Sequence, residues 1–196
     1  MNRRVIASVV FALLFTLGTQ PVDAREQTIW ERLQGTSPTG YVLLMRHALA
    51  PGVGDPENFT VNDCSTQRNL SDEGRAQAQE IGRWLKSTRI KVLRVESSRW
   101  CRAKETAKLL GMGKVKLNKN LDSLFEEVDV VNHPQTLQTR RDILAHRNKR
   151  GLLVMVGHYV NIAALTGVGV DSGSGVIVRA DRKGNIKVFG KMPIID

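Results

Sequence analysis

Two short, uninterrupted apolar runs constrain the fold of this chain more than any other feature. They cover residues 41–45 and 152–156. Runs of this length and composition are typical of strands, and a strand that is apolar on both faces must be covered on both sides. The sequence therefore predicts two central strands in a sheet that lies between two layers of helices.

Other segments alternate between strand and helix patterns. We expect further strands at 91–95, 115–117, 175–179 and 185–189, and helices that begin at Ser71 and cover 100–110, 135–146 and 160–165. The last two strands flank a hairpin signal, Asp181-Arg182-Lys183-Gly184. This alternation predicts an α/β fold: a three-layer sandwich whose mostly parallel central sheet has helices on both faces and a C-terminal hairpin at one edge.

The predicted helices have recognisable starts and buried faces. Ser71 is expected to cap the first long helix, with Asp72 and Glu73 in the first turn, where the helix dipole favours acidic side chains. Apolar residues at helical spacing mark the expected buried positions, which are Ala78, Ile81, Trp84, Leu85, Leu137, Ile143 and Leu144.

The first residues have the pattern of a secretory signal. Two arginines, at positions 3 and 4, precede an apolar run of about 13 residues, and small residues at 22 and 24 suit signal peptidase. An uncleaved anchor is the alternative, but the run is shorter than the roughly 20 residues that span a bilayer. We expect a signal peptide at 1–24 and one domain at 25–196. The mature chain is then periplasmic or secreted and has no membrane span.

The chain is strongly basic. Its net charge is +10, and cleavage would remove two arginines and one aspartate, which leaves +9. Such a charge concentrates anionic partners. The basic residues are scattered and aromatic residues make up only 5%, so a stacking platform for nucleic acid is not expected. The charge alone does not choose between anionic lipid head groups and phosphorylated small molecules.

The cysteines and two of the histidines give no sign of a metal site. In an exported protein, Cys64 and Cys101 are expected to form a disulfide, and two reduced buried thiols are the alternative. Neither cysteine has zinc-ligand spacing. His133 and His146 have no ligand spacing and no strand-end placement, so we expect them at the surface. No metal or other cofactor is predicted.

Polar residues follow three of the predicted strands. In open α/β sheets, ligands bind beyond the carboxyl ends of the strands, so these residues should converge. A guanidinium beside an imidazole suits holding a phosphate and attacking its phosphorus. The three strand ends carry Arg46-His47, then Ser97-Ser98 leading to Arg102, and Gly157-His158.

Four segments follow one another along the chain: L-M-R-H-A at 44–48, residues 67–78, S-R-W-C-R-A-K-E-T-A at 98–107 and V-G-H-Y-V-N at 156–161. In their order and spacing they resemble the histidine phosphatase superfamily. The resemblance covers roughly residues 41–167 and implies a phosphoglycerate mutase-like fold, here without a large cap insertion.

The resemblance also implies a phosphohistidine mechanism that needs no metal. Neutral His47 attacks phosphorus, and water then hydrolyses the phosphoenzyme. Arg46, Arg102 and a protonated His158 hold the phosphoryl oxygens.

Two more residues are secondary candidates for substrate binding. Arg68 lies in the long loop at 50–69, beside the predicted site, and is expected to contact phosphate or substrate; a solvated loop arginine is the alternative. Asn161 lies one helical turn after His158. It is expected to assist binding by orienting that histidine, with helix capping as the alternative.

The proton donor is less well defined. The family commonly has a glutamate two residues after a leucine that follows the third strand. Aligning that leucine with Leu121 puts Ser123 at the position, and serine is a poor acid. Asp122, Glu126 and Glu127 are the alternatives, of which Glu126 is favoured.

These features predict an exported phosphomonoesterase that works through phospho-His47, and its expected partner is a small-molecule or glycan-borne phosphate ester. Ala48 replaces the glycine that commonly follows the family's nucleophile, and we expect its amide to remain available and activity to survive. The alternatives are a non-catalytic phosphate-ester binding protein that retains the Arg/His clamp and a mutase-like phosphoryl transferase.

Overall fold

The computed structural model describes residues 24–34, 39–193 and 195. Apart from Ala24, the predicted signal peptide lies outside these residues. The strands are β1 (Val42–Arg46), β2 (Val92–Ser97), β3 (Val115–Leu117), β4 (Leu152–Gly157), β5 (Gly175–Ala180) and β6 (Ile186–Lys191). The helices are α1 (Ala24–Gln34), α2 (Asp72–Ser87), α3 (Cys101–Leu109), α4 (Pro134–His146) and α5 (Tyr159–Thr166), with short 3-10 turns η1 (Cys64–Thr66) and η2 (Lys119–Leu121). In the described part of the chain, no helix combines the length and the apolar character needed to cross a membrane.

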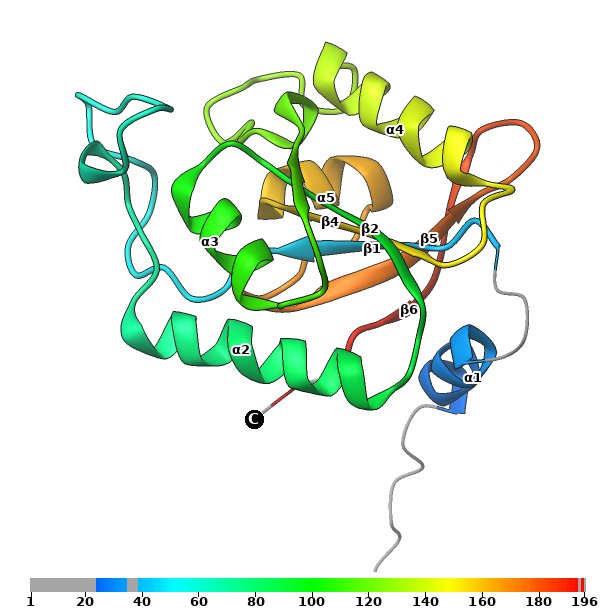
Figure 1. The fold of residues 1–196 in the computed structure, drawn as a ribbon. Helices are drawn as coiled ribbons and strands as arrows, with labels where there is room; N and C mark the ends of the chain where they lie inside the picture. Colours follow the sequence, from blue (N-terminus) through cyan, green and yellow to red (C-terminus); the bar gives the residue numbers. More distant parts are fainter. Residues whose placement is uncertain (1–23, 35–38, 194, 196) are drawn as a thin grey trace, which may run out of the picture.

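The six strands form one mixed sheet between two layers of helices (Figure 1). Their order is β3-β2-β4-β1-β5-β6, with parallel pairing from β3 to β1 and antiparallel pairing of β5 with β1 and β6. Helices α1, α2 and α3 pack on one face, and α4 and α5 pack on the other. The predicted α/β sandwich with a C-terminal hairpin edge is confirmed.

The central strands β1 and β4 supply both halves of the core. Successive side chains of a strand point to opposite faces. Leu43 and Met45 pack in the cluster with α1, α2 and α3, whereas Val42 and Leu44 pack in the cluster with α4 and α5. All six residues of β4 are buried. This two-sided burial explains why the two runs are continuously apolar.

Helix α2 begins as predicted and supports the segment that follows β1. Ser71 accepts a hydrogen bond at 3.1 Å from the Gly74 amide, which caps the helix. A Cβ at Gly74 would lie only 2.0 Å from the Leu49 carbonyl oxygen. The absence of a side chain there lets the chain after His47 pack directly against the start of α2.

Helix α4 differs from the prediction in its buried face. Leu137 and Leu144 are 38% and 37% exposed, and of the three predicted apolar positions only Ile143 is buried. The side chains of Thr136 and Thr139 are buried instead. Their hydroxyls donate to backbone carbonyl oxygens, at 2.6 Å for Thr136, which satisfies these groups in the interior.

The expectation that His146 lies at the surface is wrong. Its side chain is buried, and its Nε2 lies 3.0 Å from the Gly151 carbonyl oxygen. That oxygen accepts a hydrogen bond from Nε2–H. His133 is half-buried and caps α4, because its Nδ1 accepts a hydrogen bond at 3.2 Å from the Gln135 amide.

Candidate active site

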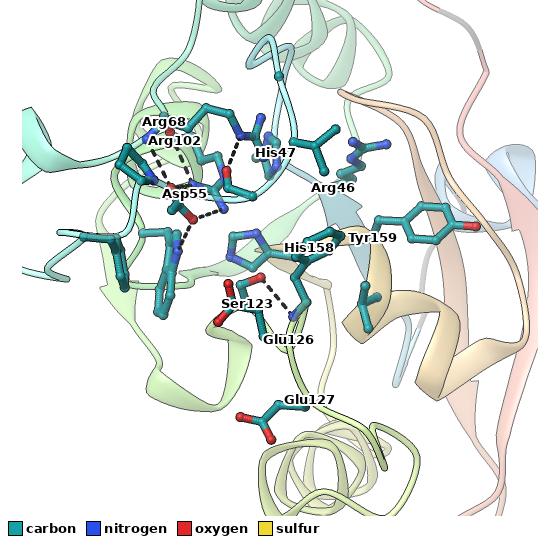
Figure 2. Close-up of a pocket in the computed structure, with 18 of the residues that line it drawn as sticks. Arg46, His47, Asp55, Arg68, Arg102, Ser123, Glu126, Glu127, His158 and Tyr159 are labelled. Carbon is teal, nitrogen blue, oxygen red and sulfur yellow. Dashed lines mark hydrogen bonds and ion pairs between the residues drawn. The ribbon is translucent and has the colours of Figure 1, made fainter.

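Sheet register brings the two predicted active-site histidines together. In the parallel pairing of β1 with β4, Arg46 lies opposite Gly157, so His47 and His158 leave neighbouring strands at the same level. Their ring centroids are 5.4 Å apart. Both rings line a pocket of about 630 Å³, which Arg46, Arg68 and Arg102 also line (Figure 2). The predicted convergence of strand ends is confirmed.

His47 is held as a neutral imidazole with a defined tautomer. Its Nδ1 lies 2.7 Å from the Ala48 carbonyl oxygen, which can only accept, so Nδ1 carries the proton and Nε2 keeps its lone pair. Burial, which this hydrogen bond partly opposes, combines with the charges of the neighbouring arginines to lower the pKa of His47 to about 3. The Nε2 lone pair is therefore available for attack at neutral pH.

The amide of Ala48 is not free, contrary to expectation. It donates to the Thr106 hydroxyl at 3.0 Å, and that hydroxyl donates to the Arg102 carbonyl oxygen at 2.7 Å. The amide is thus used inside the protein, where it ties the nucleophile's strand end to α3. The small, fully buried Ala48 side chain fits between β1 and that helix.

Three arginines, Arg46, Arg68 and Arg102, form a basic floor for the pocket. The Nε atoms of Arg46 and Arg102 are buried and have no hydrogen-bond partner within the described residues. Burial is the main cause that lowers the pKa of Arg46 and of Arg68. Unpartnered buried donors are rare in folded proteins. An anion bound in the pocket would bring negative charge close to these three guanidinium groups.

His158 differs from the prediction of a protonated side chain. Its Nε2 lies 2.9 Å from the Ser98 hydroxyl, which donates to Asp122 at 3.3 Å, so Nε2–H donates to Ser98. Burial, followed by the charges of His47 and the three arginines, lowers the pKa of His158 well below its ordinary value. In the unliganded pocket His158 is therefore neutral, because burial and the adjacent cations both disfavour a further positive charge.

The three candidate proton donors are placed very differently. Asp122 is buried and outside the pocket lining. Its two oxygens accept hydrogen bonds from the Arg99 amide at 2.8 Å and from the Arg99 Nε at 2.7 Å. Glu126 and Glu127 are exposed and line the pocket, as does Ser123. In Figure 2, Glu126 lies beside Ser123, whereas Glu127 is farther from the histidines.

A second leucine changes how the chain aligns with the family pattern. Leu124 also follows β3 and is buried, and Glu126 comes two residues after it. Alignment on Leu124 rather than Leu121 therefore brings a pocket-lining carboxylate to the position where the family has its glutamate.

Of the two secondary candidates, only Arg68 lines the pocket. Its Nε donates to the Gly54 carbonyl oxygen at 2.7 Å. Asn161 is buried outside the lining; its amide donates to the Asp122 carbonyl oxygen at 2.8 Å and accepts from the Leu124 amide at 3.3 Å. The structure thus places Asn161 as a support for the segment before Glu126, outside the lining of the pocket.

Asp55 is the site residue that the sequence did not reveal. Its carboxylate accepts from both terminal nitrogens of Arg102, at 2.7 and 2.9 Å. It also accepts from the Arg68 amide at 3.1 Å and from the Trp100 indole at 3.0 Å. These contacts outweigh burial and lower the pKa of Asp55. The residue lies in a loop without periodicity, and its Asp-Pro pair signals only a turn.

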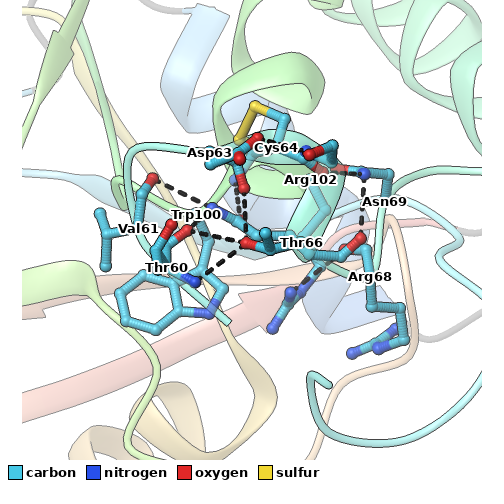
Figure 3. Close-up of a disulfide and its surroundings, with 12 residues drawn as sticks. Thr60, Val61, Asp63, Cys64, Thr66, Arg68, Asn69, Trp100 and Arg102 are labelled. Carbon is cyan, nitrogen blue, oxygen red and sulfur yellow. Dashed lines mark hydrogen bonds between the residues drawn. A yellow bond between two sulfur atoms is a disulfide. The ribbon is translucent and has the colours of Figure 1, made fainter. Parts of the chain in front are cut away.

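Cys64 and Cys101 form the predicted disulfide (Figure 3). Cys64 lies in η1, within the long loop after β1, and Cys101 begins α3. The Gln67 side chain reinforces the link, because it accepts from the Cys101 amide at 2.8 Å and donates to the Thr60 carbonyl oxygen at 2.9 Å. The loop that carries Asp55 and Arg68 is thereby attached to the helix that carries Arg102.

Comparison with known proteins agrees with this geometry. A family model, histidine phosphatase superfamily (branch 1), matches residues 42–150. No curated protein matches the chain.

Among solved structures, the protein histidine phosphatase SixA complexed with tungstate has a TM-score of 0.58 at 18% identity, over 78% of this chain and 96% of that one. A putative phosphohistidine phosphatase SixA from Nakamurella multipartitia has a TM-score of 0.58 at 16% identity, over 83% and 100%. A phosphoserine phosphatase mutant from Entamoeba histolytica has a TM-score of 0.54 at 15% identity, over 77% and 95%. These structures share the fold. Because the family model covers more than half of the sequence, the chain belongs to branch 1 of the histidine phosphatase superfamily.

Proposed function

We propose that this protein is an exported phosphomonoesterase that hydrolyses phosphate esters through a phosphohistidine on His47. The observation that carries the proposal is the neutral, tautomer-fixed imidazole of His47, which lines one pocket together with Arg46, Arg68 and Arg102. A neutral nucleophile and a preorganised cationic floor are what phosphoryl transfer requires.

In the first step, Nε2 of His47 forms a bond to phosphorus as the ester P–O bond breaks. The arginines stabilise the charge on the phosphoryl oxygens. The departing alkoxide takes a proton from the carboxyl group of Glu126, which lines the pocket and lies two residues after the buried Leu124.

In the second step, water attacks phosphorus and the N–P bond breaks. The Glu126 carboxylate takes the proton from water, and Nε2 of His47 recovers its lone pair as inorganic phosphate leaves. His158 keeps its orientation because Nε2–H donates to Ser98. Its Nδ1 donates to a phosphoryl oxygen once the bound dianion raises the pKa of the ring and a second proton is taken up. The side chains supply the positive charge that a metal supplies in other phosphatases, so we propose metal-independent turnover.

Export is part of the proposal. The basic and apolar pattern of the first 24 residues is that of a signal peptide. The Cys64–Cys101 disulfide supports an oxidising compartment such as the periplasm, because structural disulfides are rare in the cytosol. Cell fractionation of the full chain, with N-terminal sequencing of the mature form, tests this directly. An intact N-terminus in the cytosol would contradict it.

The activity is tested with p-nitrophenyl phosphate in the presence of a chelator, together with alkaline-quench trapping of label from a ³²P-labelled substrate. We expect release of p-nitrophenolate and acid-labile, base-stable label on the wild-type protein, and neither in His47→Ala. His133→Ala removes a histidine outside the pocket and is expected to retain both signals.

Two outcomes would favour the rival functions. Phosphate-ester binding without release, unaffected by His47→Ala, would support a binding protein. Transfer of the label to an added alcohol or phosphoglycerate in preference to water would support a mutase-like transferase. Label that persists in His47→Ala would overturn the choice of nucleophile.

A further inference from the structure

The upper wall of the pocket is chemically different from its arginine floor. Phe125 lines it and is 54% exposed, which is unusual for a large aromatic side chain. Trp100 and Phe59 also line it, with their rings stacked at a centroid distance of 4.9 Å. The wall thus presents aromatic surface to whatever is attached to a bound phosphate.

Three carboxylates share this wall with the aromatic rings. Glu57, Glu126 and Glu127 line the pocket and are exposed. Within the part of the chain that the structure describes, none of them is in an ion pair. This local acidity is opposite in sign to the net charge of +10. We define the upper wall as Glu57, Phe59, Trp100, Phe125, Glu126 and Glu127. In the view of Figure 2, Glu126 and Glu127 of this wall lie below the arginines.

The upper wall lies next to His158, which lines the same pocket as the arginine floor. The Trp100 ring centroid lies 5.8 Å from that of His158, and Phe59 stacks on Trp100. Opposite, the loop of Gly54 approaches Phe125, because a Cβ at Gly54 would lie 4.0 Å from the Phe125 ring. A group esterified to a phosphate on the floor therefore lies between two loops that bear aromatic rings and carboxylates (Figure 2).

The charges of the pocket determine which substrate groups fit between the two loops. The arginine floor attracts the phosphate dianion, whereas a second anionic group on the substrate would meet the carboxylates of Glu57 and Glu127. Aromatic faces combined with carboxylates attract organic ammonium ions through cation–π and Coulomb interactions. We propose that the substrate is a phosphomonoester whose alcohol carries an ammonium group, such as an aminoalkyl or trimethylammonioalkyl phosphate. This assignment of substrate class rests on the proposed phosphatase function.

The test compares phosphocholine with 3,3-dimethylbutyl phosphate, which has nearly the same shape but no positive charge. We expect kcat/KM to favour phosphocholine by about tenfold or more at low salt, the size expected of cation–π contact assisted by exposed charges. The preference should shrink at high ionic strength. Phosphoglycolate, which adds an anionic group, should be the poorest of the three.

Variants locate the source of the preference. Because the readout is the ratio of two substrates within one variant, it does not depend on overall activity. Glu57→Gln and Glu127→Gln should each reduce the phosphocholine preference by about threefold, and the double variant by more. Glu31→Gln removes the same charge from α1, outside the pocket, and should leave the ratio unchanged. An equal effect of all three variants would overturn the assignment to the upper wall.

Failure of this proposal is distinguishable from failure of the proposed function. Turnover of p-nitrophenyl phosphate without a preference for phosphocholine over its neutral analogue would overturn the substrate class alone. If no phosphate ester is hydrolysed, calorimetric binding of the same two ligands to wild type and to His47→Ala still decides the matter. Tighter binding of phosphocholine supports the upper wall as a cation site, and equal binding refutes it.

Discussion

The chemistry of His47 depends on contacts that act on its two ring nitrogens separately. The Ala48 carbonyl oxygen fixes the proton on Nδ1, and the nearby arginines, with burial, keep a second proton off Nε2. An exposed histidine would be partly protonated near its ordinary pKa of 6.5. The arginines that we propose to bind phosphate therefore also help to keep the proposed nucleophile unprotonated.

The orientation of the Arg102 guanidinium depends on its contacts with Asp55. The carboxylate takes the terminal nitrogens of Arg102 and leaves the buried Nε without a partner. We expect Asp55→Asn to lower kcat/KM for p-nitrophenyl phosphate by about 10- to 100-fold, because a guanidinium that is no longer oriented loses its aim at the phosphoryl oxygens. Steady-state kinetics and the inhibition constant of inorganic phosphate measure the effect.

A control in the same loop separates local charge from orientation. Asp63 caps η1 and lies outside the pocket lining, so Asp63→Asn should change kcat/KM by less than about threefold. If Asp55→Asn instead raises kcat/KM and tightens phosphate binding, Asp55 is a competitor of the substrate and its assignment as a positioning residue is wrong.

Among the elements, the loop between β1 and α2 contributes most to the pocket while having the least regular structure. The disulfide closes a segment with a sequence separation of 37 residues. We expect Cys64→Ser/Cys101→Ser to lower the free energy of unfolding by about 3–4 kcal/mol, mainly through the larger entropy of the unfolded chain. Urea denaturation at neutral pH measures the loss.

The same double variant should raise KM for aryl phosphates more than it lowers kcat, because the loop of Asp55 and Arg68 loses its covalent link to α3 while His47 keeps its place at the end of β1. Wild-type protein treated with reductant should match the variant. Unchanged stability and unchanged KM would show that the hydrogen bonds of Gln67 hold the loop without the disulfide.

The contrast between strands and loop explains what the sequence could reveal. Residues 42–46 and 152–157 are predictable because continuous apolar composition requires burial on both faces, and the strand ends then fix where His47 and His158 lie. Asp55 is not predictable, because its partner Arg102 is 47 residues away and only the folded loop brings them together. The buried threonines of α4 were missed because their burial depends on backbone acceptors that a sequence pattern does not display.

At the scale of the whole molecule, the fold keeps three histidines buried with lowered pKa values, namely His47, His146 and His158. The unfolded chain binds a proton at each of them below about pH 6.5, whereas the folded chain resists it. Protonation therefore favours the unfolded state as pH falls. The features that make the site reactive thus cost the protein stability in mild acid.

For His47 the pH window is defined. Its pKa is 6.5 as an ordinary histidine and about 3 in the fold, so its contribution to stability is complete above pH 6.5 and declines as pH falls towards 3. The slope approaches about 1.4 kcal/mol per pH unit within that window. Between pH 7 and pH 5, we expect the wild type to lose about 2 kcal/mol more free energy of unfolding than His47→Asn does. Urea denaturation at the two pH values gives the difference.

Val42→Ala, which removes buried volume from the same strand without a titrating group, should lower stability equally at both pH values. If His47→Asn and the wild type lose the same free energy between pH 7 and pH 5, His47 is not kept neutral by the fold.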